Sequence, residues 1–224
     1  MVNRSMLRAL IFDFDGLMVD TETVLVDAWA QVHAEDEVVC DRGILHALVG
    51  AVDVEFDIWQ QYPAERGRDE LEARYRARAR KMTWAQPALP GVRELLTEAR
   101  AAGVRLGVAS NSRHAHVEGH LEHRGMLAWF DAITCRDDVS VGKPEPEVYE
   151  LALRRLGVSA DEAIAFEDSR PGHVAAHRAG LAVMVVPNPS TAHDVFEHAR
   201  WRRDTMAALT LDDLRKLHAT RGEA

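Results

Sequence analysis

Short apolar runs recur along the chain, and each is followed by polar or glycine-containing residues. Five of these runs have the length of a β-strand: 7–12, 104–109, 130–135, 163–166 and 182–186. Continuous apolarity over so short a length is typical of strands that are buried on both faces, as in parallel sheets. The runs therefore predict a buried parallel sheet.

Amphipathic helical patterns separate the later runs. Three of them, at 91–103, 145–157 and 171–180, end at a glycine, which is a common signal for the C-terminus of a helix. Strict alternation of helices and strands specifies a parallel sheet with helices on both faces. We therefore predict an α/β fold with a Rossmann-like parallel sheet core, which the strand at 7–12 also joins.

Residues 21–86 have a different pattern, because no strand-like run interrupts them. Three stretches of this segment are helical in pattern: 24–34, 53–62 and 71–82. We predict an inserted α-helical cap at 21–86, and an α/β catalytic core made of 1–20 and 87–224. The prolines of 86–91 disfavour continuation of a helix, so this stretch is expected to be the return linker.

The composition is that of an ordinary globular protein, with 47% hydrophobic and 28% charged residues in 224. A net charge of −9 argues against nucleic acid as a partner, because that needs a basic surface. Cys40 and Cys135 form no CxxC motif, so we expect free thiols in a reducing compartment. No stretch approaches the roughly 18 apolar residues of a membrane span, and no signal peptide is visible. We expect a cytoplasmic protein without a membrane partner.

Residues that could take part in catalysis or ligand binding follow four of the predicted strands. They are Asp13, Asp15, Ser110, Asn111, Lys143, Glu167 and Asp168. In open α/β sheets, ligands bind outside the carboxyl ends of the strands, so these side chains are expected to meet at one edge. Four acids so close together would not all stay ionised without a cation between them. Oxygen ligands suit Mg²⁺, and a lysine beside them suits a phosphoryl group, so the pattern predicts a phosphoryl-transfer site.

Four motifs occur in order along the chain: "DFDGLMVD" at 13–20, "SNS" at 110–112, "GKP" at 142–144 and "EDS" at 167–169. On these motifs the chain resembles the haloacid dehalogenase superfamily, in the branch of β-phosphoglucomutase-like phosphatases with a helical cap. The resemblance covers nearly the whole chain. It implies a phosphatase that depends on Mg²⁺ and hydrolyses a small phosphorylated metabolite, such as a sugar phosphate.

The same resemblance implies a role for each motif residue. Asp13 is the implied nucleophile, which forms an aspartyl-phosphate, and Asp15 the implied general acid and base. Ser110 and the Asn111 amide are implied to hold phosphoryl oxygens, and Lys143 to offset the negative charge. The residues implied to bind substrate are Asp13, Asp15, Gly16, Ser110, Asn111 and Lys143. The residues implied to hold Mg²⁺ are Asp13, the backbone carbonyl of Asp15, Glu167 and Asp168.

Other chemistries of the superfamily are less favoured. Dehalogenases work without Mg²⁺ and lack an acid at the position of Asp15. A phosphomutase of the β-phosphoglucomutase type is the alternative. Two residues depart from that type: Leu25 occupies the position of its cap histidine, and Asp53 lies three residues after Gly50, where an arginine is expected. A phospho-accepting regulatory domain would lack both Asp15 and a large helical insertion. We expect a monomer, with a dimer left open.

Several histidines are interpreted as structural. His116 and His120 have the i, i+4 spacing of a zinc site, but no Glu or Cys completes it, so a solvated helix face is predicted. His173 and His177 have the same spacing and receive the same interpretation. The basic stretch at 74–80 is also interpreted as a solvated face, because acids precede its arginines at helical ion-pair spacing.

Overall fold

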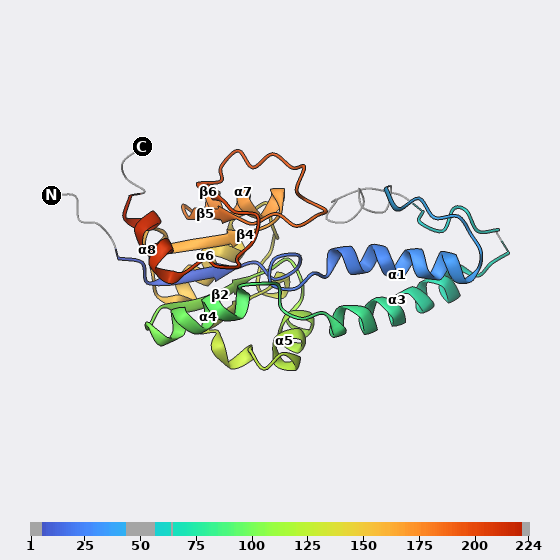
Figure 1. Cartoon of the computed structure of the whole chain (residues 1–224), viewed down its shortest axis with the longest axis horizontal. Helices are drawn as coiled ribbons and strands as arrows, with labels where there is room; N and C mark the ends of the chain where they lie inside the picture. Colours follow the sequence, from blue (N-terminus) through green and yellow to red (C-terminus); the bar gives the residue numbers. More distant parts are fainter. Residues whose placement is uncertain (1–5, 44–56, 64, 221–224) are drawn as a thin grey trace. The chain divides into compact units, whose positions relative to one another are not determined.

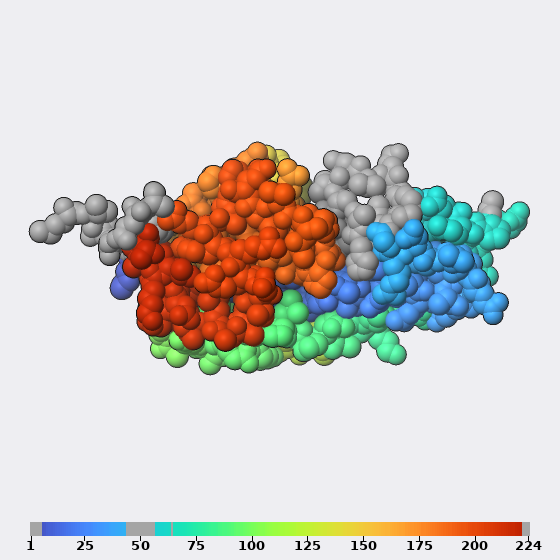
Figure 2. Space-filling view, turned by 45° about the horizontal axis from the view of Figure 1, so that its top comes forward, coloured from blue at the N-terminus to red at the C-terminus, as the bar shows by residue number. Residues whose placement is uncertain are grey.

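The computed structural model describes residues 6–43, 57–63 and 65–220. The chain divides into two compact units: the core unit, Met1–Val19 with Ala88–Ala224, and the insert unit, Asp20–Pro87. Figure 1 shows the chain coloured from blue at the N-terminus to red at the C-terminus. In Figure 2, residues near the C-terminus, in orange and red, cover one face of the core unit. No helix in the described ranges is long and apolar enough to cross a membrane.

The described part of the core unit forms a six-stranded parallel sheet with the order β3-β2-β1-β4-β5-β6. The strands are β1 (Ala9–Phe12), β2 (Arg105–Ala109), β3 (Ala132–Thr134), β4 (Ala163–Glu167), β5 (Ala182–Val185) and β6 (Trp201–Arg202). The five predicted strands and their parallel arrangement are confirmed. The sequence did not indicate β6, because a strand of two residues has no apolar run. The strand β1 lies between β2 and β4, so Asp13, the residue after β1, lies at the end of a central strand.

Helices cover both faces of this sheet, as predicted. They are α4 (Val92–Ala101), α5 (His114–His123), α6 (Glu147–Leu156), α7 (Arg170–Arg178) and α8 (Leu211–Ala219). Alternate residues of β1 point to opposite faces, because the side chains of a strand have a period of two. Leu10 and Phe12 pack with α4, α5 and α8, whereas Ala9 and Ile11 pack with α6 and α7.

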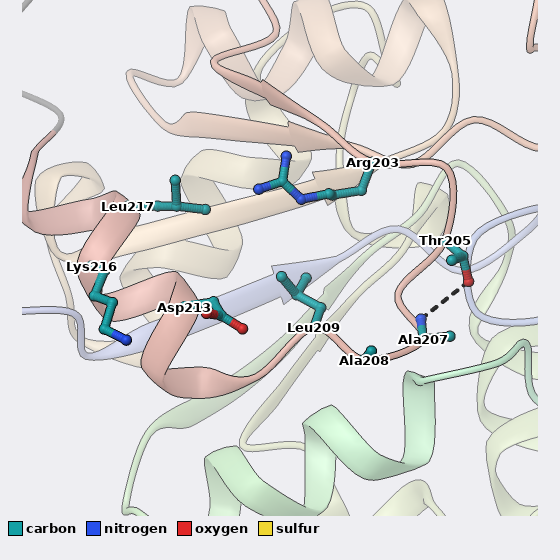
Figure 3. A pocket seen from close by; sticks show the side chains of 8 residues that line it. All are labelled: Arg203, Thr205, Ala207, Ala208, Leu209, Asp213, Lys216 and Leu217. Atoms are coloured by element: carbon teal, nitrogen blue, oxygen red, sulfur yellow. Dashed lines mark hydrogen bonds between the residues drawn. The ribbon is translucent and has the colours of Figure 1, made fainter.

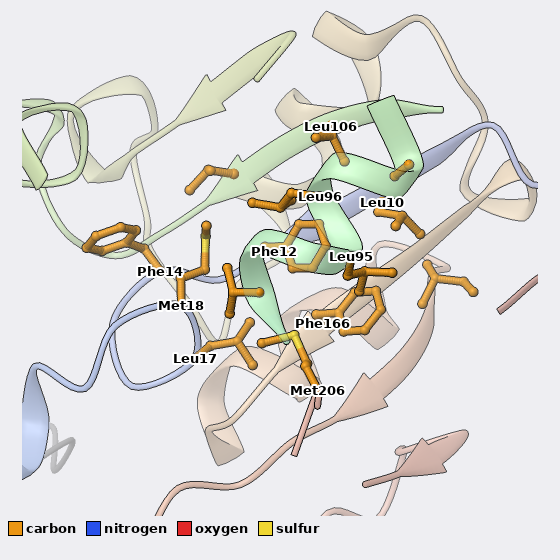
Figure 4. Close-up of a cluster of buried hydrophobic side chains, with 14 of the residues drawn as sticks. Leu10, Phe12, Phe14, Leu17, Met18, Leu95, Leu96, Leu106, Phe166 and Met206 are labelled. Carbon is orange, nitrogen blue, oxygen red and sulfur yellow. The ribbon is translucent and has the colours of Figure 1, made fainter. Parts of the chain in front are cut away.

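The cluster on the first face is the larger of the two sheet clusters, and Figure 4 shows part of it. Phe12 and Phe166 stack with ring centroids 4.6 Å apart, and Leu95 of α4 packs on the same cluster. Leu17 and Met18 of the first motif are also fully buried in this cluster. Full burial of such side chains contributes about 1.5–3 kcal/mol each to folding, so this cluster anchors the loop that carries Asp13.

The helix α4 starts at a glycine that no other residue could replace without strain. Gly91 has φ +87°, and a Cβ there would lie 2.1 Å from the backbone oxygen of Met206. The left-handed backbone conformation favours glycine, which has no Cβ to clash. The close approach lets the segment before α8 pack directly on the start of α4.

The insert unit contains two long helices, α1 (Glu22–Glu35) and α3 (Arg68–Ala85), which pack on each other. An aromatic cluster lies between them and the segment 57–63. Trp29 stacks on Tyr75 with centroids 4.6 Å apart, and Trp59 and Tyr62 are buried beside them. These aromatic side chains form the small core of the insert unit.

The helix predicted at 53–62 is wrong for its described part. Residues 58–61 form a turn, in which Asp57 Oδ1 accepts a hydrogen bond from the backbone N–H of Trp59 at 2.9 Å. An aspartate that bonds the backbone two residues later favours a turn over a helix. The rest of that stretch, together with Gly50 and Asp53, lies outside the described residues.

The basic stretch of α3 is paired with acids, but one of its partners is not the expected one. Arg76 pairs with Glu72 at 2.8 Å, one turn before it, as its spacing indicates. Arg74 instead reaches α1 and contacts Asp36 at 2.7 Å and Glu35 at 2.9 Å. Both acids have a pKa below the ordinary value, because the arginines of α3 donate hydrogen bonds to them.

Candidate active site

The carboxyl ends of the central strands bring the predicted residues to one edge of the sheet. Asp13 directly follows β1, and its N–H donates to the carbonyl of Phe166 in β4 at 3.0 Å. Ser110 follows β2, Glu167 ends β4, and Asp168 comes next. Parallel strands all end at the same edge, so residues far apart in sequence become neighbours there. The four side chains are buried.

Three buried carboxylates at this edge have the composition of a site for a hard cation. Asp13, Glu167 and Asp168 each offer one oxygen, and these oxygens lie within 4.8 Å of one another. Carboxylate oxygens are the ligands of Mg²⁺, and mutual repulsion among buried acids favours a cation between them. The donor set therefore fits Mg²⁺. Participation of the Asp15 carbonyl stays a prediction.

Lys143 bridges two of these acids. Its Nζ donates to Asp13 Oδ1 at 2.5 Å and to Glu167 Oε1 at 2.7 Å, and only 4% of its side chain is exposed. Burial alone would lower the pKa of Lys143, but the charges of Asp13 and Glu167 raise it above the ordinary value. The lysine is therefore a fixed positive charge beside the carboxylates.

Burial disfavours the ionised form of Asp13 even though Lys143 lies beside it. Burial raises the pKa of Asp13 to about 8, Lys143 opposes that shift, and the charge of Glu167 adds to it. A carboxylate acts as a nucleophile only when it is deprotonated. A further positive charge would favour the deprotonated nucleophile, and the three carboxylate oxygens offer a place for it.

Tyr149 donates to the same oxygen of Glu167 as Lys143 does. Its hydroxyl donates to Glu167 Oε1, and its ring lies 5.2 Å from the Nζ of Lys143. Tyr149 belongs to α6 and is fully buried. Tyr149 was not predicted, because its position in α6 marks it only as a residue of the buried face of that helix.

Asn111 ties the second motif to the third. Its Oδ1 accepts a hydrogen bond from the Lys143 N–H at 2.7 Å, and its Nδ2 donates to the Lys143 carbonyl at 3.2 Å. A Cβ on Gly142 would lie 2.5 Å from that Oδ1, so a glycine there allows the approach. The Asn111 side chain thus positions Lys143; contact of its amide with a phosphoryl oxygen stays a prediction.

Asn188 holds Asp168 and the first motif together. Its Nδ2 donates to Asp168 Oδ2 at 2.7 Å and to the Gly16 carbonyl at 3.4 Å. A Cβ on Gly16, where φ is +76°, would lie 2.4 Å from the same Asp168 oxygen. Asn188 was not predicted, although its place just after the fifth apolar run was a usable signal. Asn188 orients an implied metal ligand.

Replacement of Asn188 by alanine is expected to weaken Mg²⁺ binding about tenfold, because Asp168 loses the N–H that orients it. The measurement is calorimetric titration of Mg²⁺ into the metal-free protein. Ser190→Ala, in the same loop, is the matched control, because the Ser190 hydroxyl has no hydrogen-bond partner among the residues that the structure describes. Equal affinities for wild type and Asn188→Ala would contradict the role of Asn188.

Asp15 does not join the three buried carboxylates; its side chain contacts the segment after β2. Ser112 Oγ donates to Asp15 Oδ2 at 2.5 Å, and the Nε2–H of His116 donates to Asp15 Oδ1 at 2.8 Å. Burial lowers the pKa of His116, but the hydrogen bond and charge of Asp15 raise it above the ordinary value. The two aspartates of the first motif therefore have different surroundings.

The prediction of a solvated histidine face on α5 is wrong for two residues. His116 faces Asp15, and His120 is buried with its Nδ1 accepting a hydrogen bond from Arg124 at 2.9 Å. Burial, together with the charges of His116 and Arg124, lowers the pKa of His120 to about 4. His173 of α7 is also buried, against Phe196, whereas His177 is exposed as predicted. Helical spacing alone does not say which face packs on the sheet.

One cavity of the core unit lies away from these carboxylates. It has a volume of about 450 Å³ and is lined by residues between Arg203 and Leu217, including Asp213 and Lys216 (Figure 3). None of the four motifs contributes to its lining. The cavity is therefore not part of the candidate active site.

Comparison with known proteins gives consistent matches over most of the chain. The family model "Haloacid dehalogenase-like hydrolase" matches residues 10–186. The protein YhcW of Bacillus subtilis (strain 168) is 38% identical over 217 residues, which cover 93% of this chain and 98% of YhcW. Hexitol phosphatase B of Escherichia coli (strain K12) is 32% identical over 212 residues, which cover 92% of this chain and 96% of that protein. The crystal structure of CbbY from Rhodobacter sphaeroides in complex with phosphate has a TM-score of 0.74 and 31% identity, with 93% of this chain and 99% of that chain covered.

Proposed function

Since this chain belongs to the haloacid dehalogenase-like hydrolases and is a phosphatase, we propose that it hydrolyses a small, sugar-like phosphomonoester with the help of Mg²⁺. The observation that carries the proposal is the buried Asp13, which contacts Lys143 and lies beside Glu167 and Asp168 at the strand ends. The hexitol phosphatase and the phosphate-bound CbbY support this substrate class.

In the proposed reaction, an oxygen of Asp13 attacks phosphorus and the bond to the alkoxide leaving group breaks. Asp15 gives the leaving oxygen a proton, which yields the free alcohol and an aspartyl-phosphate. Asp15 then takes a proton from water as the water oxygen attacks phosphorus. This second displacement releases inorganic phosphate and restores the Asp13 carboxylate.

The remaining residues of the site stabilise charge. Lys143 offsets the charge of Asp13 and of the phosphoryl oxygens, and Ser110 offers a hydroxyl donor at the end of β2. Mg²⁺, held by Asp13, Glu167 and Asp168, would supply positive charge to the nucleophile and the transferring group. We further propose that the insert unit is a cap that selects the substrate, and that the core unit is the catalytic domain.

The test is phosphate release from a panel of sugar phosphates, hexitol phosphates and an aryl phosphate, with Mg²⁺ and with excess EDTA. We expect release with Mg²⁺ and its loss in EDTA, restored by added Mg²⁺. Release that persists in EDTA would contradict the metal dependence. Conversion of β-glucose 1-phosphate into glucose 6-phosphate without phosphate release would replace the phosphatase by the phosphomutase alternative.

Binding of Mg²⁺ is expected to release a proton at neutral pH. The pKa of Asp13 is raised to about 8, so the metal-free site holds a proton below that pH, and the cation must displace it. Affinity should therefore rise with pH up to about 8, by at most about tenfold per pH unit from this group, and then level off. Calorimetry in two buffers of different ionisation enthalpy measures the released proton. Identical heats in both buffers would contradict the prediction.

A further inference from the structure

The Asp15 carboxylate is held at both of its oxygens by side chains from the segment that follows β2. Ser112 donates to Oδ2 at 2.5 Å and His116 to Oδ1 at 2.8 Å. Two donors on two oxygens oppose rotation of a carboxylate about its Cβ–Cγ bond. The orientation of Asp15 is therefore set by this segment as well as by its own backbone.

His116 is in turn held by aromatic packing. Its ring meets the edge of Phe14 with centroids 5.8 Å apart and an interplanar angle of 87°, and it contacts His120 at 4.6 Å. Phe14 lies between the two aspartates of the first motif and is fully buried. His120 is buried one turn later in α5, where Arg124 donates to it. The His116 ring therefore has its direction fixed from two sides.

The surroundings of His116 separate it from the charge-stabilising part of the site. The contacts of Lys143 and Asn188 are with Asp13, Glu167 and Asp168, whereas those of His116 are with Asp15, Phe14 and His120. Among the hydrogen bonds of the described residues, His116 reaches the site through Asp15, so a change at His116 should act mainly through Asp15. Its side chain is 37% exposed, so substitutions there need not disrupt the core.

We propose that His116 is a positioning residue, which holds the Asp15 carboxylate in the orientation from which it exchanges a proton with the leaving oxygen. The inference rests on the proposed function, because it assigns a task to Asp15 in that reaction. Proton transfer depends strongly on the placement of the acid relative to the reacting oxygen. Without His116, Ser112 holds one oxygen, and the carboxylate rotates away from the productive direction.

The test compares three variants by kcat/KM, which reports the steps up to formation of the aspartyl-phosphate. In His116→Leu, kcat/KM for an alkyl phosphate should fall about 10–50-fold, because an alkoxide needs protonation as it leaves. The value for 4-nitrophenyl phosphate, whose leaving group needs little protonation, should fall less than about threefold. His116→Gln should retain alkyl activity within about threefold, because its amide nitrogen lies two bonds beyond Cγ, as Nε2 does.

His116→Asn is the matched control for His116→Gln, because it carries the same amide one methylene shorter and does not reach Asp15. Its kcat/KM values should match those of His116→Leu, and it replaces the leucine variant in the comparison if that variant does not fold. His193→Leu changes a histidine whose side chain is 76% exposed and should have no effect. The thermal unfolding midpoint of each variant shows whether the fold is retained.

Three results would overturn the assignment. They are unchanged or raised alkyl kcat/KM in both His116→Leu and His116→Asn, equal losses for alkyl and aryl phosphates, or a glutamine variant as impaired as the asparagine variant. Failure of the proposed function is seen separately. In that case the wild-type protein releases no phosphate from the panel, or Asp13→Asn retains the wild-type rate.

Discussion

Asp13→Asn is expected to abolish phosphate release, with a fall in kcat of at least about 10⁴-fold, because the amide nitrogen and oxygen cannot form the covalent intermediate. The change preserves the shape of the side chain. Asp13 is buried and lies beside Lys143 and the two acids of the fourth motif, so the amide remains among the same neighbours. The measurement is phosphate release with the best substrate of the panel.

The Asp13→Asn variant also separates loss of chemistry from loss of fold. Lys143 keeps Glu167 as an ionised partner when Asp13 is changed, at 2.7 Å. Removal of one acid from a cluster of buried carboxylates also relieves repulsion, so the thermal unfolding midpoint of the metal-free protein should not fall appreciably. The exposed Asp204 provides a matched control, since Asp204→Asn makes the same change outside the site. Retention of more than about one tenth of the wild-type kcat in Asp13→Asn would contradict the nucleophilic role.

Lys143→Met is expected to affect both stability and activity. Lys143 is the buried cation between Asp13 and Glu167, and removal of one partner of a buried ion pair costs about 3–5 kcal/mol in the free energy of unfolding. Methionine has a similar length and no charge, so most of the loss in the free energy of unfolding reflects the buried acids that no longer have a cation beside them. Phosphate release should fall at least about 10²-fold, because the charge of the phosphoryl group is no longer offset.

The destabilisation by Lys143→Met should depend on pH with a definite sign. Burial raises the pKa of Asp13 and Lys143 lowers it, so without the lysine the pKa of Asp13 in the folded state lies further above its value in the unfolded chain. The folded variant then binds more protons than the unfolded chain, so its stability falls as pH rises above the unfolded value of about 4. Unfolding of both proteins at about pH 4.5 and about pH 7.5 measures the effect, with the larger difference expected at the higher pH.

Lys216→Met is the matched control for this comparison. Lys216 lies on α8, is 71% exposed and pairs with Asp212 on the surface. A surface pair of this kind contributes less than about 1 kcal/mol, so the control should unfold close to wild type at both pH values. A Lys143→Met variant with wild-type stability at the higher pH would contradict the charge balance described for the site.

The sheet was predictable from the sequence because its determinants are local. The run 163–166 is apolar at each of its positions and β4 ends one residue later, on Glu167, and glycines end the patterns of α4 and α6. The turn after Asp57 was not predicted, because one side chain that bonds the backbone outweighs an ambiguous helical pattern there. The two-residue β6 forms only because β5 lies beside it.

The sequence by itself determined the alternation of strands and helices and the identity of the residues that follow the strands. Burial of short apolar runs, with glycine and proline between them, depends on neighbours in the chain. Only the tertiary structure decided which distant side chains meet: His116 with Asp15, Asn188 with Asp168 and Tyr149 with Glu167. These contacts depend on the order of strands in the sheet and on the face that each helix turns toward it. The periodicity of a single segment does not show which face of a helix packs on the sheet. The sequence therefore predicts a solvated face for the histidines of α5, whereas in the fold one of them, His116, contacts Asp15.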